Sequence, residues 1–98
     1  MPSFIESVHS VCKRIPKGKV STYSEIAKAI GKPKACRAVG NALNRNRSKN
    51  VPCHRVIRSD RSIGGFARGA KAKEKLLREE GVAITKGKVA ESRIFRLV

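Results

Sequence analysis

The fold of this chain is decided by residues 22–43, which read TYSEIAKAIGKPKACRAVGNAL. Thr22 followed by Glu25 has the spacing of a capping box, which predicts that a short helix begins there. Gly31 is expected to end that helix, and the Lys-Pro pair after it supplies a turn. A second, strongly basic helix is predicted from about Lys34 to Leu43. Two short helices joined in this way are typical of a helix-turn-helix unit.

Working outward, the residues before this unit predict another helix. Apolar side chains recur there at intervals of three and four residues, and the pattern stops before Pro16. These side chains are Phe4, Val8, Val11, Cys12 and Ile15.

After the unit, the segment Ile63–Phe66 is expected to form a small wing, following a turn at residues 59–62. The spacing of apolar residues predicts a last helix from Ala70 to Glu80, ended by Gly81. The tail, residues 82–98, is expected to form a weak hairpin around Lys86-Gly87-Lys88. The predicted fold class is therefore mainly α: a winged helix-turn-helix DNA-binding domain with a small β wing, built as one domain over residues 1–98.

The charge of the chain indicates a polyanionic partner. Lysine and arginine total 23 against 7 acidic residues, for a formal net charge of +16, and no acid occurs between Glu25 and Asp60. A basic stripe of this kind gains affinity for phosphates by releasing counterions, which favours nucleic acid. General solubility and the acidic surface of a protein partner remain alternatives. Without an apolar run of about 20 residues, we expect no membrane association and a cytoplasmic protein.

Chemistry is indicated by Cys53-His54, which lie in the sequence Pro-Cys-His-Arg-Val. A cysteine attacks as its thiolate, and the neighbouring Arg55, the basic stripe and an imidazole would all favour that form. His54 is adjacent in sequence, so we expect it to take the proton through a bridging water. A carboxylate should then orient the ring, and Glu79 and Glu80 are the candidates. The alternative is a buried cysteine beside a surface histidine.

The other cysteines, Cys12 and Cys36, leave the chain with an odd number and no disulfide spacing. Cys12 follows His9 by three residues, a spacing that would allow a zinc site with Cys53 and His54. No close pair of cysteines anchors such a site. Packing of Cys12 in the core is the favoured interpretation.

Several motifs together resemble the C-terminal active-site domain of the O6-alkylguanine-DNA alkyltransferases. They occur in family order and cover residues 4 to 82. They are IPKGKVSTY at residues 15–23, RAVG at 37–40, Asn46, PCHRVI at 52–57, Gly64-Gly65, and Leu76-Leu77 leading to Glu80-Gly81. The resemblance implies a suicide repair protein that flips an O6-alkylated guanine out of the duplex and moves the alkyl group to its own cysteine, in a single turnover and without a cofactor or metal.

The resemblance also implies a role for each matching residue. Cys53 would be the acceptor, His54 and Glu80 the proton relay, and Asn46 a brace for the nucleophile loop. The pocket for the flipped base would be formed by Tyr23, Val56, Gly65, Phe66, Ala67 and Lys73. Tyr23 would donate to the guanine ring and help to rotate the nucleotide, and the loop Gly65–Ala67 would close over the base.

The implied partner is double-stranded DNA containing O6-alkylguanine, bound through its minor groove by a monomer. Arg37 matches the arginine finger that fills the gap left by the extruded base. The remaining expected DNA contacts are Thr22, Ser24, Lys34, Ala38, Gly40 and Arg45.

The sequence departs from the family pattern in four places. The N-terminal domain of larger members is not seen, so the zinc that some relatives hold there is not expected. Arg68 stands where a glycine is usual, the turn at Asp60-Arg61 lacks its usual glycine, and Arg47 replaces a proline. A chain this small also resembles the alkyltransferase-like proteins, which bind alkylated DNA without repairing it and commonly carry tryptophan where this chain has Cys53. That sensor and an ordinary winged-helix regulator are the rival interpretations.

Overall fold

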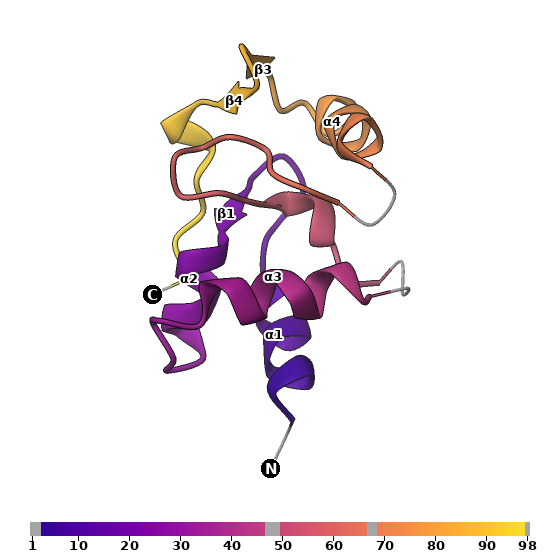
Figure 1. The fold of residues 1–98 in the computed structure, drawn as a ribbon. Coiled ribbons are helices and arrows are strands. Elements are labelled where there is room, and N and C mark those ends of the chain that lie inside the picture. Colours follow the sequence, from indigo (N-terminus) through magenta and orange to yellow (C-terminus); the bar gives the residue numbers. More distant parts are fainter. Residues whose placement is uncertain (1–2, 47–49, 67–68, 98) are drawn as a thin grey trace.

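The computed structural model describes residues 3–46, 50–66 and 69–97 (Figure 1). Its helices are α1 (Phe4–Cys12), α2 (Tyr23–Ala29), α3 (Cys36–Asn44) and α4 (Ala70–Glu79), with short 3-10 turns η1 (Cys53–Arg55) and η2 (Glu91–Arg93). Its strands are β1 (Ser21–Thr22), β2 (Val56–Ile57), β3 (Ile84–Thr85) and β4 (Lys88–Val89). The predicted mainly helical class is confirmed.

A capping box that the sequence analysis did not identify starts α1. The Ser3 hydroxyl accepts a hydrogen bond from the Glu6 backbone N–H at 3.1 Å, and the Glu6 carboxylate accepts one from the Ser3 N–H. The helix ends at Cys12, three residues earlier than the apolar pattern predicts, because the chain tightens into turns at Arg14 and Ile15. Ile15 is nonetheless buried, so the periodicity located the core side chains correctly.

The capping box predicted for α2 is only half present. The Thr22 hydroxyl accepts from the Glu25 N–H at 3.1 Å, as expected. The Glu25 carboxylate does not return to the cap; it accepts a hydrogen bond from the Leu97 N–H at 2.9 Å instead. The reciprocal bond is therefore replaced by a tertiary contact, which ties the C-terminal tail to the helix-turn-helix unit.

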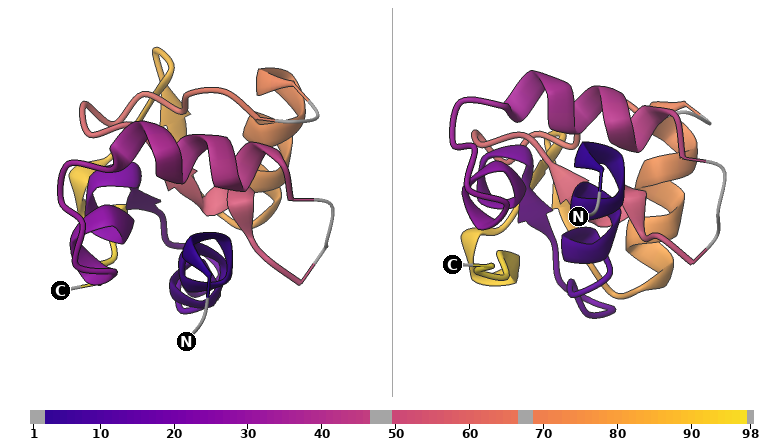
Figure 2. Two further views of the ribbon diagram at one scale, coloured as in Figure 1. Left: turned by 60° about the horizontal axis from the view of Figure 1, so that its bottom comes forward. Right: turned by 90° about the horizontal axis from the view of Figure 1, so that it is seen from below.

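The turn between α2 and α3 forms as the sequence predicts. Gly31 has φ +79°, a left-handed conformation that favours glycine. The N–H groups of Gly31 and Lys32 bond the carbonyls of Lys28 and Ala27, which is the Schellman pattern that ends many helices. α3 begins two residues later than predicted and packs against both α1 and α2. Figure 2 shows α1 and α2 lying side by side against α3, with α4 at the far side of the molecule from α2.

Two small pairs of strands complete the fold. β1 and β2 pair in parallel, with Ser21 opposite Val56, so the end of the nucleophile segment lies beside the start of α2. β3 and β4 form the antiparallel hairpin predicted around residues 86–88. The prediction of a wing at Ile63–Phe66 is wrong in detail, since those residues form no strand. The hairpin provides the wing, and it holds the preceding loop through a Ser62–Lys88 bridge and an Ile63 N–H bond to the Gly87 carbonyl.

Arg61 in that loop has φ +72°, in the region where glycine is favoured. The departure noted at Asp60-Arg61 therefore falls on a strained position, at a cost of roughly 1–2 kcal/mol.

The core consists of two clusters. One lies among the first three helices and consists of Val8, Cys12, Ile15, Ile26, Ala27, Val39, Ala42, Leu43, Val51, Val56 and Leu97. The other lies among α4, β2 and the tail and consists of Val20, Ile57, Leu77, Val82, Ile84 and Val89. Cys12 is fully buried in the first cluster, as expected. Within the described ranges, no helix has the length and apolar character needed to cross a membrane.

Candidate active site

Cys53 begins the 3-10 turn η1, directly before β2, and hydrogen bonds hold both its sulfur and the backbone that precedes it. The Asn46 side-chain amide donates to the Cys53 Sγ at 2.9 Å and to the Val51 carbonyl at 3.4 Å. Behind the loop, the buried Cys12 thiol donates to the Pro52 carbonyl at 3.5 Å. The asparagine expected to brace this loop therefore contacts the sulfur itself.

The pKa of the Cys53 thiol is raised above its ordinary value, because half-burial disfavours the charged thiolate. The hydrogen bond from Asn46 and the positive charge of Lys73 act in the opposite direction and do not overcome the burial. The expectation that Arg55 would favour the thiolate is not met, since its guanidinium is engaged elsewhere. Burial thus favours the neutral thiol form of Cys53.

The base candidate, His54, is oriented by the carboxylate of Glu80 at the end of α4. His54 Nε2 lies 2.9 Å from Glu80 Oε2. Arg55 approaches the same carboxylate with two nitrogens, at 2.9 and 2.7 Å, and donates a third hydrogen bond to the Ile15 carbonyl. Glu79 is exposed on the outer face of the helix. Of the two candidate carboxylates, the structure brings Glu80 to the histidine.

Glu80 has a pKa below its ordinary value. Partial burial alone would raise it, but the hydrogen bonds from Arg55 and His54 and their positive charges outweigh that effect. The side chains of His54, Arg55 and Glu80 are only 15%, 17% and 13% exposed, so solvent screens this cluster weakly. Glu80 therefore stays ionised at neutral pH, as a residue that orients an imidazole must.

A second cluster surrounds the hydroxyl of Tyr23. Lys73 is completely buried, and its ammonium donates to the carbonyls of Val56 and Gly65 and, at 3.4 Å, to the Tyr23 hydroxyl. Burial lowers the pKa of Lys73 to about 8 and raises that of Tyr23. The structure thus brings together four of the residues predicted to form the base pocket. Phe66 is half-buried, and Ala67, like Arg47 and Arg68, lies outside the described residues.

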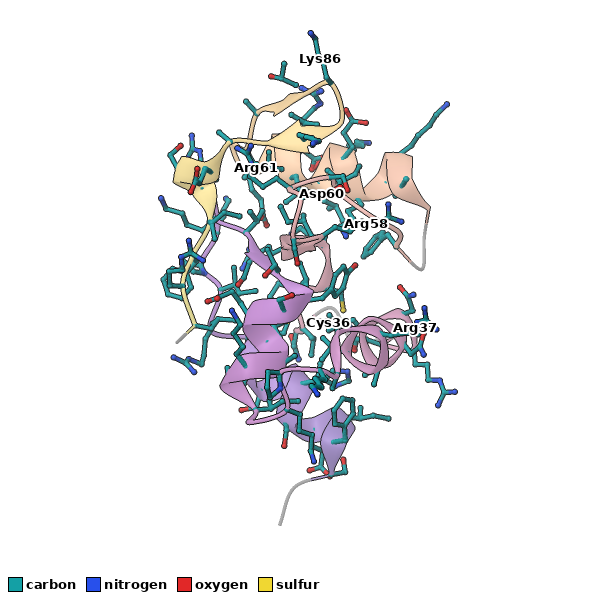
Figure 3. The ribbon with its side chains drawn as sticks, turned by 60° about the vertical axis from the view of Figure 1, so that its left-hand side comes forward. Cys36, Arg37, Arg58, Asp60, Arg61 and Lys86 are labelled. Carbon is teal, nitrogen blue, oxygen red and sulfur yellow. The ribbon has the colours of Figure 1, made fainter. Side chains whose placement is uncertain are left out.

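The residues predicted to contact DNA gather on α2 and α3. Lys34, Arg37, Ala38 and Arg45 are exposed, and Figure 3 shows Arg37 and its neighbour Cys36 on one side of the molecule. Ser24 binds both the Cys36 thiol, at 3.3 Å, and the Ser59 hydroxyl, at 2.9 Å.

Two of the residues predicted to contact DNA also make contacts within the fold. Thr22 is 8% exposed and its hydroxyl caps α2, so its side chain offers little surface to a ligand. Gly40 packs beside the Tyr23 ring, where an added Cβ would stand 3.9 Å from the ring, an ordinary van der Waals distance.

Fold and site together define a winged helix-turn-helix protein in which a half-buried thiol lies beside an imidazole paired with a carboxylate. Residues 3–82 match the family described as 6-O-methylguanine DNA methyltransferase, DNA binding domain, and the chain belongs to that family. The matched range is almost the same as residues 4 to 82, the range that the motifs covered.

Individual relatives agree with this assignment. A methylated-DNA–protein-cysteine methyltransferase of Methanosarcina acetivorans is 53% identical over 79 residues, which are 80% of this chain and 51% of that protein. The bifunctional transcriptional activator/DNA repair enzyme Ada of Escherichia coli is 42% identical over 80% of this chain and 22% of its own length. The chain thus spans about half of the length of the first of these curated relatives and about a fifth of the second.

Two solved structures resemble the chain closely. Mycobacterium tuberculosis OGT in complex with DNA gives a TM-score of 0.77 at 40% identity, covering 82% of this chain and 50% of that one. S. pombe Atl1, in complex with damaged DNA containing O6-carboxymethylguanine, gives 0.85 at 34% identity, covering 98% of this chain and 99% of that one.

Proposed function

We propose that this protein repairs O6-alkylguanine in double-stranded DNA by moving the alkyl group irreversibly to Cys53, and that the matched domain is the one that carries the active site. The observation that carries the proposal is the arrangement around position 53: a thiol touched by Asn46, followed by a histidine whose ring is paired with Glu80. A plain DNA-binding module needs none of these contacts.

In the proposed reaction, His54 takes the Cys53 proton through a water while Glu80 stabilises the resulting imidazolium. The thiolate sulfur attacks the alkyl carbon, a carbon–sulfur bond forms, and the bond between that carbon and guanine O6 breaks. The electron pair stays on the guanine, and Tyr23 donates a hydrogen bond to the ring as negative charge develops. The ring then takes up one proton, which balances the proton that left Cys53. The products are unmodified guanine and an S-alkylated protein that cannot react again.

Recognition is proposed to use the helix-turn-helix face. α3 enters the minor groove, and its small residues permit close approach. Arg37 occupies the space of the extruded base, replacing part of the lost stacking. Lys34 and Arg45 contact phosphates at the two ends of the helix.

A second candidate, a lesion sensor that binds without transfer, is favoured by one observation. Atl1 resembles this chain with a TM-score of 0.85, against 0.77 for Mycobacterium tuberculosis OGT. Cys53 separates the two candidates, because a sensor has no use for a positioned thiol.

Intact mass after incubation with a duplex containing O6-methylguanine tests the proposal. We expect one added methyl group per chain, located by peptide mapping on Cys53 and not on Cys12 or Cys36. Unchanged mass with preferential binding of the lesion would identify a sensor. Unchanged mass without that preference would identify a winged-helix regulator.

A further inference from the structure

Arg58 lies at the edge of the base pocket, although no motif pointed to it. It follows β2 directly and starts the loop closed by hydrogen bonds to Ser62 and Arg61. Its side chain crosses Gly64: a Cβ built there would stand 3.3 Å from Arg58 Cγ, 3.5 Å from Arg58 Nε and 3.6 Å from the Tyr23 hydroxyl. The absence of a side chain at Gly64 thus lets the guanidinium approach the phenol.

The guanidinium of Arg58 has no ion pair or hydrogen bond within residues 3–46, 50–66 and 69–97. Other arginines of the chain are paired, Arg55 with Glu80 and Arg78 with Glu74. The acid nearest in sequence, Asp60, uses its Oδ1 to accept from the backbone and hydroxyl of Ser62. Arg58 is also exposed, and Figure 3 shows it on the same side as Arg37. An unpaired cation is therefore directed at the face proposed to meet DNA.

The surroundings of Arg58 favour an anion. Its charge acts on both Tyr23 and Lys73, lowering the pKa of each. Two cations thus lie near one phenol, and within the described residues neither of them pairs with a carboxylate. Guanine is neutral and would not compensate this charge, whereas a phosphodiester would. A planar guanidinium binds phosphate with two parallel hydrogen bonds.

We propose that Arg58 is a substrate-binding residue that grips a phosphate flanking the extruded nucleotide. The inference rests on the proposed function, because a base held at Tyr23 and Lys73 must be joined to its backbone at the rim where Arg58 lies. The contact would form after the nucleotide rotates and would hold it in the pocket.

The test is a double-mutant cycle in which a substitution in the protein is combined with the replacement of one phosphate in the DNA. Duplexes carry O6-methylguanine with either its 5′ or its 3′ phosphate replaced by a neutral methylphosphonate, and the protein is wild type or Arg58→Gln. Lesion affinity is measured by fluorescence anisotropy, and single-turnover transfer by quenched flow. For wild type, we expect one methylphosphonate to weaken lesion binding by roughly ten- to a hundredfold, the range for a charge-assisted hydrogen bond. Arg58→Gln should show the same loss and then be insensitive to that methylphosphonate.

Matched controls isolate the contact. Lys75→Gln removes an exposed cation from the outer face of α4, where it lines a separate hollow with Glu74 and Glu79. It should change lesion affinity by less than threefold, as expected for a distant surface charge, and keep the methylphosphonate effect. Arg58→Lys should restore part of the affinity. Transfer from free O6-benzylguanine, which has no phosphate, should fall by much less in Arg58→Gln than transfer from DNA does.

Equal methylphosphonate penalties in wild type and Arg58→Gln would overturn the inference, and so would equal losses on DNA and on the free base. If wild type binds the lesion but transfers nothing, the proposed repair function fails while the affinity cycle still decides the role of Arg58.

Discussion

At the residue scale, one carboxylate serves two neighbours. Glu80 accepts from both His54 and Arg55, and Arg55 also bonds the Ile15 carbonyl. The position of the imidazole therefore depends on a bridge between α4 and the loop after α1. Orientation of the imidazole and tertiary packing therefore use the same side chain.

The first prediction follows from this bridge. Glu80→Gln should slow single-turnover transfer by at least tenfold, because a neutral amide no longer stabilises the imidazolium that forms when Cys53 ionises. His54→Ala should slow it too, and the double variant should lose less than the sum, since groups acting as a unit are not additive.

Glu79→Gln is the control for this prediction, because Glu79 is adjacent in sequence but exposed on the outer face of α4. It should leave transfer unchanged. If neither glutamate variant slows the reaction, Cys53 does not depend on a relay and is activated by the Asn46 hydrogen bond and by Lys73.

The second prediction concerns pH and Lys73, whose pKa burial lowers from 10.5 to about 8. Below pH 8 the lysine is charged in both the folded and the unfolded chain. Between about pH 8 and 10.5 it is neutral in the folded chain and still protonated in the unfolded one. The unfolded state then binds more protons, so raising the pH through this window stabilises the fold.

Urea unfolding from pH 7 to pH 10 measures this effect. The free energy of unfolding of wild type relative to Lys73→Met, which has no such titration, should increase above pH 8. A flat difference across the series would mean that the three oxygens around the ammonium compensate its burial fully.

At the element scale, α3 is the part of the helix-turn-helix to which the proposed function assigns both DNA binding and base extrusion. It begins at Cys36 without a side-chain cap, carries Arg37 one residue later and ends beside Arg45. One face is buried through Val39, Ala42 and Leu43, while both arginines are exposed. The same helix thus has an exposed cation at each end, and the proposed function assigns the two arginines different tasks.

The third prediction compares these two arginines. Arg37→Ala should slow repair of duplex DNA by roughly tenfold or more, since extrusion costs a few kcal/mol that the guanidinium helps to offset. It should spare free O6-benzylguanine. Arg45→Ala should instead weaken binding to lesion and normal duplexes alike and reduce the slope of affinity against salt by about one phosphate.

Transfer rates on both substrates and binding at several salt concentrations distinguish these outcomes. Equal losses on the duplex and on the free base would make Arg37 a structural residue.

At the scale of the whole molecule, the tail beyond the matched family region completes the core. Val20 pairs with Ile94, the Leu97 backbone bonds Glu25, and the Leu97 side chain is 4% exposed within the first core cluster. A chain of this size buries a modest fraction of its surface and has little stability to spare. These terminal contacts are therefore important for the helix-turn-helix.

The fourth prediction tests the tail. Leu97→Ala should lower the free energy of unfolding by about 2–4 kcal/mol, the range for a buried leucine that leaves a cavity. Ile5→Ala on α1 removes an apolar side chain that is 39% exposed and should cost less than about 1 kcal/mol. Urea denaturation of both variants checks the prediction, and similar small losses would show that the tail does not contribute to the core.

The amino-acid sequence by itself determined the helices, their turns and the nucleophile segment. Periodicity identified α1 and α4, Gly31 ended α2 through a backbone conformation that favours glycine, and the hairpin at residues 86–88 followed from its turn. These signals are readable because each depends on interactions among residues a few positions apart.

Only the tertiary structure decided which charged groups, far apart in the sequence, bond to which partners. Glu25 bonds the tail instead of its own cap, Arg55 pairs with Glu80 instead of activating Cys53, and Lys73 is buried beneath Tyr23. The unpaired Arg58 beside the pocket was likewise invisible in the sequence. A long charged side chain can reach several partners. Which partner it meets, and how the pKa values of its neighbours shift, is decided only after packing has brought separate segments together and removed the water between them.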